Sequence, residues 1–158
     1  MSDLFISYYS NDWRGSMLSN LHPTPFIMDN IRLSCMESLV QSMNFPENDW
    51  RHVACFELSG PECKAMMYEA MEILSLKGTV HWKGEEMMWG GKDHLSILRR
   101  GLNLKFSQHE LSREALEDTI GMRLVYDAPE NDRICSYPPD EFVIALQEIR
   151  ESMIVKGR

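Results

Sequence analysis

One carboxylate in this chain has a setting suited to chemistry. Glu37 follows Ser34 with the S-x-x-E spacing of a capping box, which predicts a helix that starts at Ser34. Two roles are open for this glutamate. It can cap a free backbone N–H at the helix start, or its carboxylate can lie in a pocket beside the preceding loop, which carries Asn20 and His22, and take part in a reaction.

The elements that must position Glu37 follow from local patterns. Residues 4–9 are rich in strand formers and predict a first strand. Short apolar runs on either side of Asp29-Asn30, a turn pair that accepts unusual backbone angles, predict a hairpin over 26–33. Asp49 is expected to cap a short helix over 49–58.

The rest of the chain is predicted to be mostly helical. Gly60-Pro61-Glu62 is typical of a helix start, and helical spacing continues through residue 76. A helix over 92–106 contains Gly101, which we expect to cost about 1 kcal/mol relative to alanine. The remaining predictions are a short strand at 79–82, a loop at 87–92, a last strand at 123–126 and a final helix that carries Phe142, Leu146, Ile149 and Met153.

The run LSNLHPTPFIMDNIRLSCMESLVQSMNF resembles the opening of the NADAR/YbiA-like family, with its S-N-F, P-F and [ST]-x-E-x-x-x-Q motifs. A second run, LSILRRGLNLKFSQHELSREALEDTIG, resembles the later helices of that family. The resemblance implies a single YbiA-like α+β domain over residues 1–158. It also implies hydrolysis of an N-glycosidic bond in an ADP-ribose-type substrate. The catalytic glutamate of the family falls on Glu37, and the conserved glutamine falls on Gln41.

The resemblance suggests further residues for this site. Asp132 falls on a family aspartate and is expected to position the sugar or water; otherwise it is a solvated turn residue. Asn20 belongs to the matched opening motif. Lys64, three residues after Pro61, is expected either to reach ligand phosphates or to be a solvated surface lysine.

Three more candidate binding residues come from local features. Lys92 follows two glycines at a helix start, which is either a phosphate cradle or an ordinary turn. Trp89 is expected to stack on a base or to close the core. Tyr137 is the ring nearest to the position where the family has a tryptophan, a position that Cys135 occupies here, and it is the candidate replacement.

Composition limits the function classes. A net charge of −8 argues against an extended nucleic-acid groove, whereas the basic stretch of Lys92, Arg99, Arg100 and Lys105 suits a pocket for a single nucleotide. No apolar run approaches the roughly 20 residues that span a bilayer, and Met1-Ser2-Asp3-Leu4 does not resemble a signal peptide, so we expect a cytoplasmic protein.

The sequence predicts no metal and no cofactor. The four cysteines form no C-x-x-C pair and are expected to be reduced and mostly buried. His52, Cys55 and Cys63 are close in sequence but lack a convincing fourth ligand for zinc.

These features are consistent with two functions. The first is a divergent N-glycosyl hydrolase that acts on a ribosylated nucleotide or base. The alternative is a catalytically degenerate YbiA-like domain that binds a ligand or a protein partner. The alternative has support because the family tryptophan and its glycine-rich loop are missing around residues 135–139.

Overall fold

The computed structural model describes residues 1–128 and 135–156, with the side chains of 74–77 left out. About half of the chain is helical and the strands are short, as in the predicted α+β class. The helices are α1 Trp13–Met17, α2 Met36–Ser42, α3 Trp50–Glu57, α4 Gly60–Ala65, α5 Met67–Lys77, α6 Lys92–Gln108, α7 Glu110–Glu117 and α8 Pro139–Lys156. The strands are β1 Asp3–Phe5, β2 Phe26–Met28, β3 Ile31–Leu33, β4 Thr79–Trp82, β5 Glu85–Met88 and β6 Arg123–Val125.

The described strands form three separate pairs. β2 and β3 make the predicted hairpin around Asp29-Asn30, and both turn residues have positive φ, 53° and 64°. β4 and β5 make a second hairpin around Lys83-Gly84, so the expectation of a loop at 87–92 is wrong for residues 87 and 88. The turn pair Lys-Gly lacks the Asn-Gly or Asp-Gly signature, which explains why this hairpin was missed.

The third pair joins distant parts of the chain. β1 and β6 are parallel, with Asp3 opposite Arg123 and Phe5 opposite Val125. The guanidinium of Arg123 also donates to both carboxylate oxygens of Asp3, at 2.9 and 2.7 Å. The predicted first strand over 4–9 is therefore much shorter, and residues after Phe5 turn away towards α1.

Helix starts follow the predicted chemistry in two places. The Asp49 side chain accepts from the Arg51 N–H at the start of α3. At the start of α4, Ser59 and Glu62 form a reciprocal capping box, with proline in the first turn. The single helix expected through residue 76 is divided into α4 and α5, because the chain turns at Met66.

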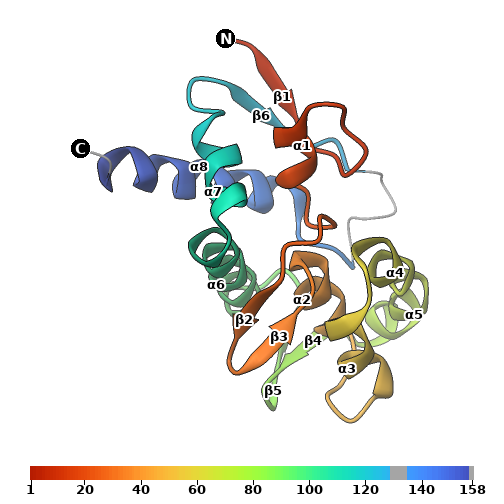
Figure 1. Cartoon of the computed structure of the whole chain (residues 1–158). Coiled ribbons are helices and arrows are strands. Elements are labelled where there is room, and N and C mark those ends of the chain that lie inside the picture. The colour runs from red at the N-terminus through yellow and green to blue at the C-terminus, as the bar shows by residue number, and fades with distance from the viewer. Residues whose placement is uncertain (129–134, 157–158) are drawn as a thin grey trace.

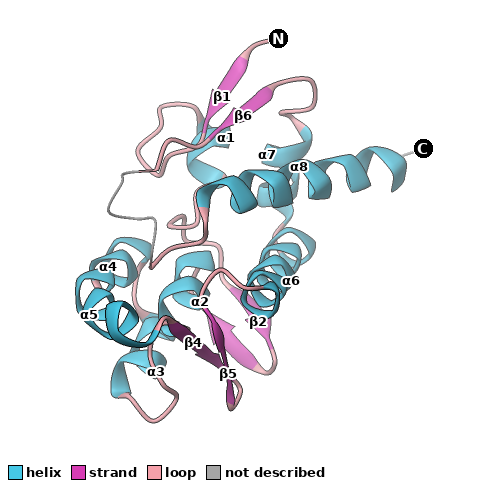
Figure 2. Ribbon diagram, turned by 180° about the vertical axis from the view of Figure 1, so that it is seen from behind, coloured by secondary structure: helices cyan, strands magenta, loops and turns pink. Residues whose placement is uncertain are grey.

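The elements gather in two groups on either side of α6 (Figures 1 and 2). One group contains β1, β6, α1, α7 and α8, and the other contains α2 to α5 with the two hairpins. Gly101 lies where α6 crosses α2, since a Cβ there would be 2.3 Å from Leu39 Cδ2. The helix-propensity cost of Gly101 is therefore opposed by packing, because the glycine permits the close approach of α6 and α2. None of the described helices is both long and apolar enough to cross a membrane.

Candidate functional site

Glu37 lies in the first turn of α2, but its side chain does not cap the helix. The N-cap is Cys35, whose backbone N–H donates to Ser38 Oγ at 3.3 Å. The predicted capping box of Ser34 and Glu37 is therefore wrong by one residue. The reason is a tertiary contact, since the Ser34 hydroxyl donates to the backbone carbonyl of Leu58.

The carboxylate of Glu37 is instead held by amide side chains inside the protein. Gln41 Nε2 donates to Glu37 Oε1 at 2.8 Å and to the carbonyl of Cys135 at 3.1 Å. Asn44 Nδ2 donates to Gln41 Oε1 and to the same carbonyl, both at 3.0 Å. Glu37 is only 2% exposed, so burial and donors together fix the direction of its carboxylate.

The loop before β2 closes over the start of α2. The backbone N–H of Glu37 donates to the Asn20 carbonyl at 2.8 Å. Lys105, on α6, is fully buried, and its Nζ donates to the carbonyls of Met17 and Ser19 at 3.1 and 3.2 Å. Burial lowers the pKa of Lys105 to about 8. This loop is therefore anchored from two sides, by α2 and by α6.

Asn20 carries an unused acceptor at this point. The residue is 5% exposed, and its Oδ1 is buried without a hydrogen-bond partner in the described structure. Buried polar side-chain atoms are normally paired, so such an acceptor is available to water or to a ligand hydroxyl.

A pocket of about 390 Å³ lies next to this loop, within the size range of small-molecule sites. Ser19 and Leu21 line it from the loop, and Lys64 lines it from α4. Lys64 Nζ donates to Ser136 Oγ at 2.9 Å. Ser136 directly follows Cys135, whose carbonyl accepts from Gln41. Glu37 is not among the lining residues; the loop lies between its backbone and the pocket.

Three tyrosines in the pocket wall were missed by sequence reasoning. Tyr8 and Tyr9 follow β1, and Tyr126 follows β6. Because β1 and β6 are parallel, their carboxyl ends meet at the same edge and bring these residues together. Asp127 also lines the pocket and adds a negative charge opposite in sign to Lys64. The sequence feature that could have identified them is the presence of aromatic residues at the ends of the two predicted strands.

The two rings proposed from sequence lie elsewhere. Trp89 packs beside His94, with ring centroids 6.1 Å apart, and its Nε1 is buried without a described partner. Tyr137 is 3% exposed and packs against Phe142 at 5.4 Å. Neither ring lines the pocket beside the loop. Asp132 lies outside the described residues.

The glycines before Lys92 already use their backbone donors. The Gly90 N–H donates to His94 Nδ1 at 2.8 Å, and the Gly91 N–H donates to the Met88 carbonyl at 3.0 Å. Lys92 itself is exposed at the first position of α6. A phosphate in this turn would compete with these two hydrogen bonds, so Lys92 stays a prediction without a formed cradle.

The basic stretch that includes Lys92 does not gather into one nucleotide pocket. Arg99 pairs with Glu148 at 2.7 Å, and Arg100 pairs with Asp29, also at 2.7 Å. The ammonium group of Lys105 donates to the carbonyls of Met17 and Ser19. Arg99, Arg100 and Lys105 therefore each stabilise a different contact instead of converging on one ligand site.

The cysteines are free and buried, and the described residues contain no group of three or more His, Cys, Asp or Glu that could hold a metal ion. His52 Nδ1 lies 2.7 Å from the Ser42 carbonyl, and the Cys63 thiol donates to the Cys55 carbonyl at 3.2 Å. These side chains therefore serve the packing of α2, α3 and α4.

Comparison with known proteins places the fold. No family model matches the chain, and no curated protein matches its sequence. The NMR structure of the E. coli protein YbiA is similar, with a TM-score of 0.66 at 20% sequence identity, over 99% of this chain and 89% of YbiA. At that identity the similarity defines architecture alone. This chain therefore has a YbiA-like α+β fold.

Proposed function

We propose that this protein hydrolyses an N-glycosidic bond on the ribose of an ADP-ribose-type nucleotide or base, with Glu37 as the chief catalytic residue. The observation that carries the proposal is the buried carboxylate of Glu37, oriented by Gln41 and one loop away from a pocket with tyrosines and a lysine.

The chemistry of the bond calls for these residue types. Cleavage of a ribosyl C–N bond develops positive charge at the anomeric carbon, as in glycoside hydrolysis generally. A fixed carboxylate stabilises that charge or activates the attacking water. Lys64 lines the pocket and is suited to hold a phosphate. Asn20, whose Oδ1 is unused, does not line the pocket but lies between the lining residues Ser19 and Leu21. Tyr8 and Tyr126 offer ring faces for the base or the sugar.

The second candidate is a YbiA-like domain that binds its ligand without cleaving it. One observation favours it: Glu37 does not line the pocket, and Trp89 and Lys92 lie outside it. In this function the amide network around Glu37 only supports the pocket wall.

One substitution separates the two candidates. Glu37→Gln keeps an oxygen that can accept from Gln41, so we expect a melting temperature within about 2 °C of the wild type. Release of free base from ribosylated nucleotides, followed by chromatography, should fall by at least about 100-fold in the variant. The matched control is Glu57→Gln, which removes an exposed carboxylate on α3 and should hydrolyse at the wild-type rate.

Calorimetry with ADP-ribose completes the test. Hydrolysis at the same rate in the Glu37→Gln and wild-type proteins would remove Glu37 from the mechanism. Binding of ADP-ribose by a wild-type protein that releases no base from any ribosylated substrate would establish the second candidate. Lys64→Met should weaken binding in either case, because it removes the cation that lines the pocket.

A further inference from the structure

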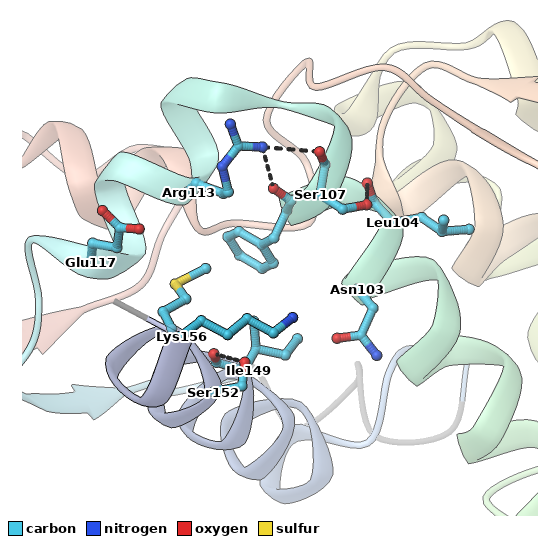
Figure 3. Close-up of a pocket in the computed structure, with 10 residues that line it drawn as sticks. Asn103, Leu104, Ser107, Arg113, Glu117, Ile149, Ser152 and Lys156 are labelled. Atoms are coloured by element: carbon cyan, nitrogen blue, oxygen red, sulfur yellow. Dashed lines mark hydrogen bonds between the residues drawn. The ribbon is translucent and has the colours of Figure 1, made fainter. Parts of the chain in front are cut away.

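A second pocket lies between α6, α7 and α8 (Figure 3). Its volume is about 560 Å³, larger than the pocket beside the loop, and the two share no lining residue. The walls include the apolar side chains of Phe106, Ile149 and Met153. Phe106 and Ile149 belong to the hydrophobic core and are 2% and 5% exposed, so the floor of this pocket is part of the core.

The polar groups around this apolar floor are not used by the fold. Lys156, Glu117 and Asn103 line the pocket, and none of their side chains makes a hydrogen bond or ion pair in the described part of the chain. In Figure 3 the ammonium of Lys156 extends towards Asn103, and the carboxylate of Glu117 lies on the opposite side. The pocket therefore has one basic end and one acidic end.

Arg113, also in the wall, is already engaged. Its Nη1 donates to the carbonyls of Phe106 and Ser107 at 3.1 and 2.9 Å, where α6 ends (Figure 3). These bonds satisfy carbonyls that the end of a helix leaves without partners. Among the described residues that line this pocket, Lys156 is thus the cation available to a ligand.

We propose that this pocket binds a small amphipathic molecule with an apolar body and a single carboxylate. The apolar body covers Phe106, Ile149 and Met153, and the carboxylate binds Lys156 and Asn103. Glu117 repels a second negative charge, which selects monoanions over dianions. This inference concerns a different pocket and does not depend on the proposed hydrolysis.

The test uses decanoate as the probe and isotope-labelled protein observed by NMR. Decanoate should shift the amide resonances around the three wall helices in a saturable way, whereas acetate, which has no apolar body, should not. Decanol should bind more weakly than decanoate, because it lacks the charge that pairs with Lys156.

Three variants assign the site. Lys156→Met keeps the aliphatic stem and should weaken decanoate binding by about five-fold, the upper range for one exposed ion pair. Arg32→Met removes one positive charge at an exposed position of β3 and should leave the affinity unchanged. Ser152→Trp places a ring in the pocket from an exposed position on α8 and should abolish binding.

The proposal is overturned if decanoate causes no saturable shift, or if decanol binds as tightly as decanoate. Equal affinities for the Lys156→Met and Arg32→Met proteins would also overturn it. So would unchanged binding by a folded Ser152→Trp protein, since the pocket would then not be the site.

Discussion

Replacing Lys105 with methionine removes an ammonium group that is fully buried between α6 and the loop before β2. Nζ donates to the carbonyls of Met17 and Ser19, and no carboxylate pairs with it among the described residues. The variant leaves the Met17 carbonyl without this donor, at a cost of about 1–3 kcal/mol, whereas the Ser19 carbonyl still accepts from the backbone N–H of His22 at 3.2 Å. It also removes the cost of burying the charge, and that part depends on pH.

The sign of the pH dependence follows from proton binding. Burial lowers the pKa of Lys105 from 10.5 to about 8, so between these values the unfolded chain binds more protons than the folded protein. The free energy of unfolding therefore rises with pH across this window, and the gain is lost as the pH falls back to 8. From these two pKa values, the titration of Lys105 should make the wild type roughly 1 kcal/mol more stable at pH 9 than at pH 7.

Urea unfolding of the wild type and the Lys105→Met protein at pH 7 and pH 9 measures this pH-dependent contribution of Lys105 to the free energy of unfolding. The hydrogen bond with Cys63, together with burial, raises the pKa of Cys35, and burial raises the pKa of Cys135 to about 11, so both thiols stay protonated in the two folded proteins and their effect cancels in the comparison. Burial lowers the pKa of His22 and His109, and the positive charge of Lys105 lowers both further. Lys156→Met, at an exposed lysine, is the control and should show no such change. A wild-type-to-variant difference that is the same at both pH values would refute the reasoning.

Three further substitutions test the packing. Gly101→Ala should destabilise by about 1–3 kcal/mol in urea unfolding, because the added Cβ would be 2.3 Å from Leu39; helix propensity alone predicts the opposite sign. Gly60→Ala would bring a Cβ within 2.1 Å of the Leu21 carbonyl, so ligand titration should show weaker binding in the pocket beside the loop, and unchanged binding would contradict this packing. Phe142→Ala should cost about 3–5 kcal/mol, since the ring is fully buried, and a loss below 1 kcal/mol would show that the core is loosely packed.

Local sequence was sufficient to predict the elements whose turn, cap and apolar residues are close together in the chain. The Asp29-Asn30 hairpin was predictable because these two residues tolerate positive φ. The Asp49 cap and the helix start at Gly60-Pro61-Glu62 were predictable from local sequence as well, although the capping role of Ser59 was not predicted. The long helices α6 and α8 were predictable from apolar spacing, which marked Phe142 as buried.

The rest required contacts between distant segments. The cap of α2 moved by one residue because the Ser34 hydroxyl bonds the Leu58 carbonyl, which no spacing rule could indicate. The tyrosine wall arises from the pairing of β1 with β6, and the burial of Lys105 arises from the loop that it anchors. The roles of Glu37 and Asp132 stay predictions, since the geometry around the first supports them only in part and the second lies outside the described residues.

The pairing of β1 with β6 also bears on how the chain folds during its own synthesis. Asp3 and Arg123 are 120 residues apart, and at roughly 5–20 residues per second the ribosome needs about 6–24 s to translate that interval. During this time the first strand has no partner, and the tyrosine wall cannot form. Helices α2 to α4, which are close in sequence, can pack against one another during this time. The amide network around Glu37 is completed later still, because Gln41 and Asn44 both donate to the carbonyl of Cys135.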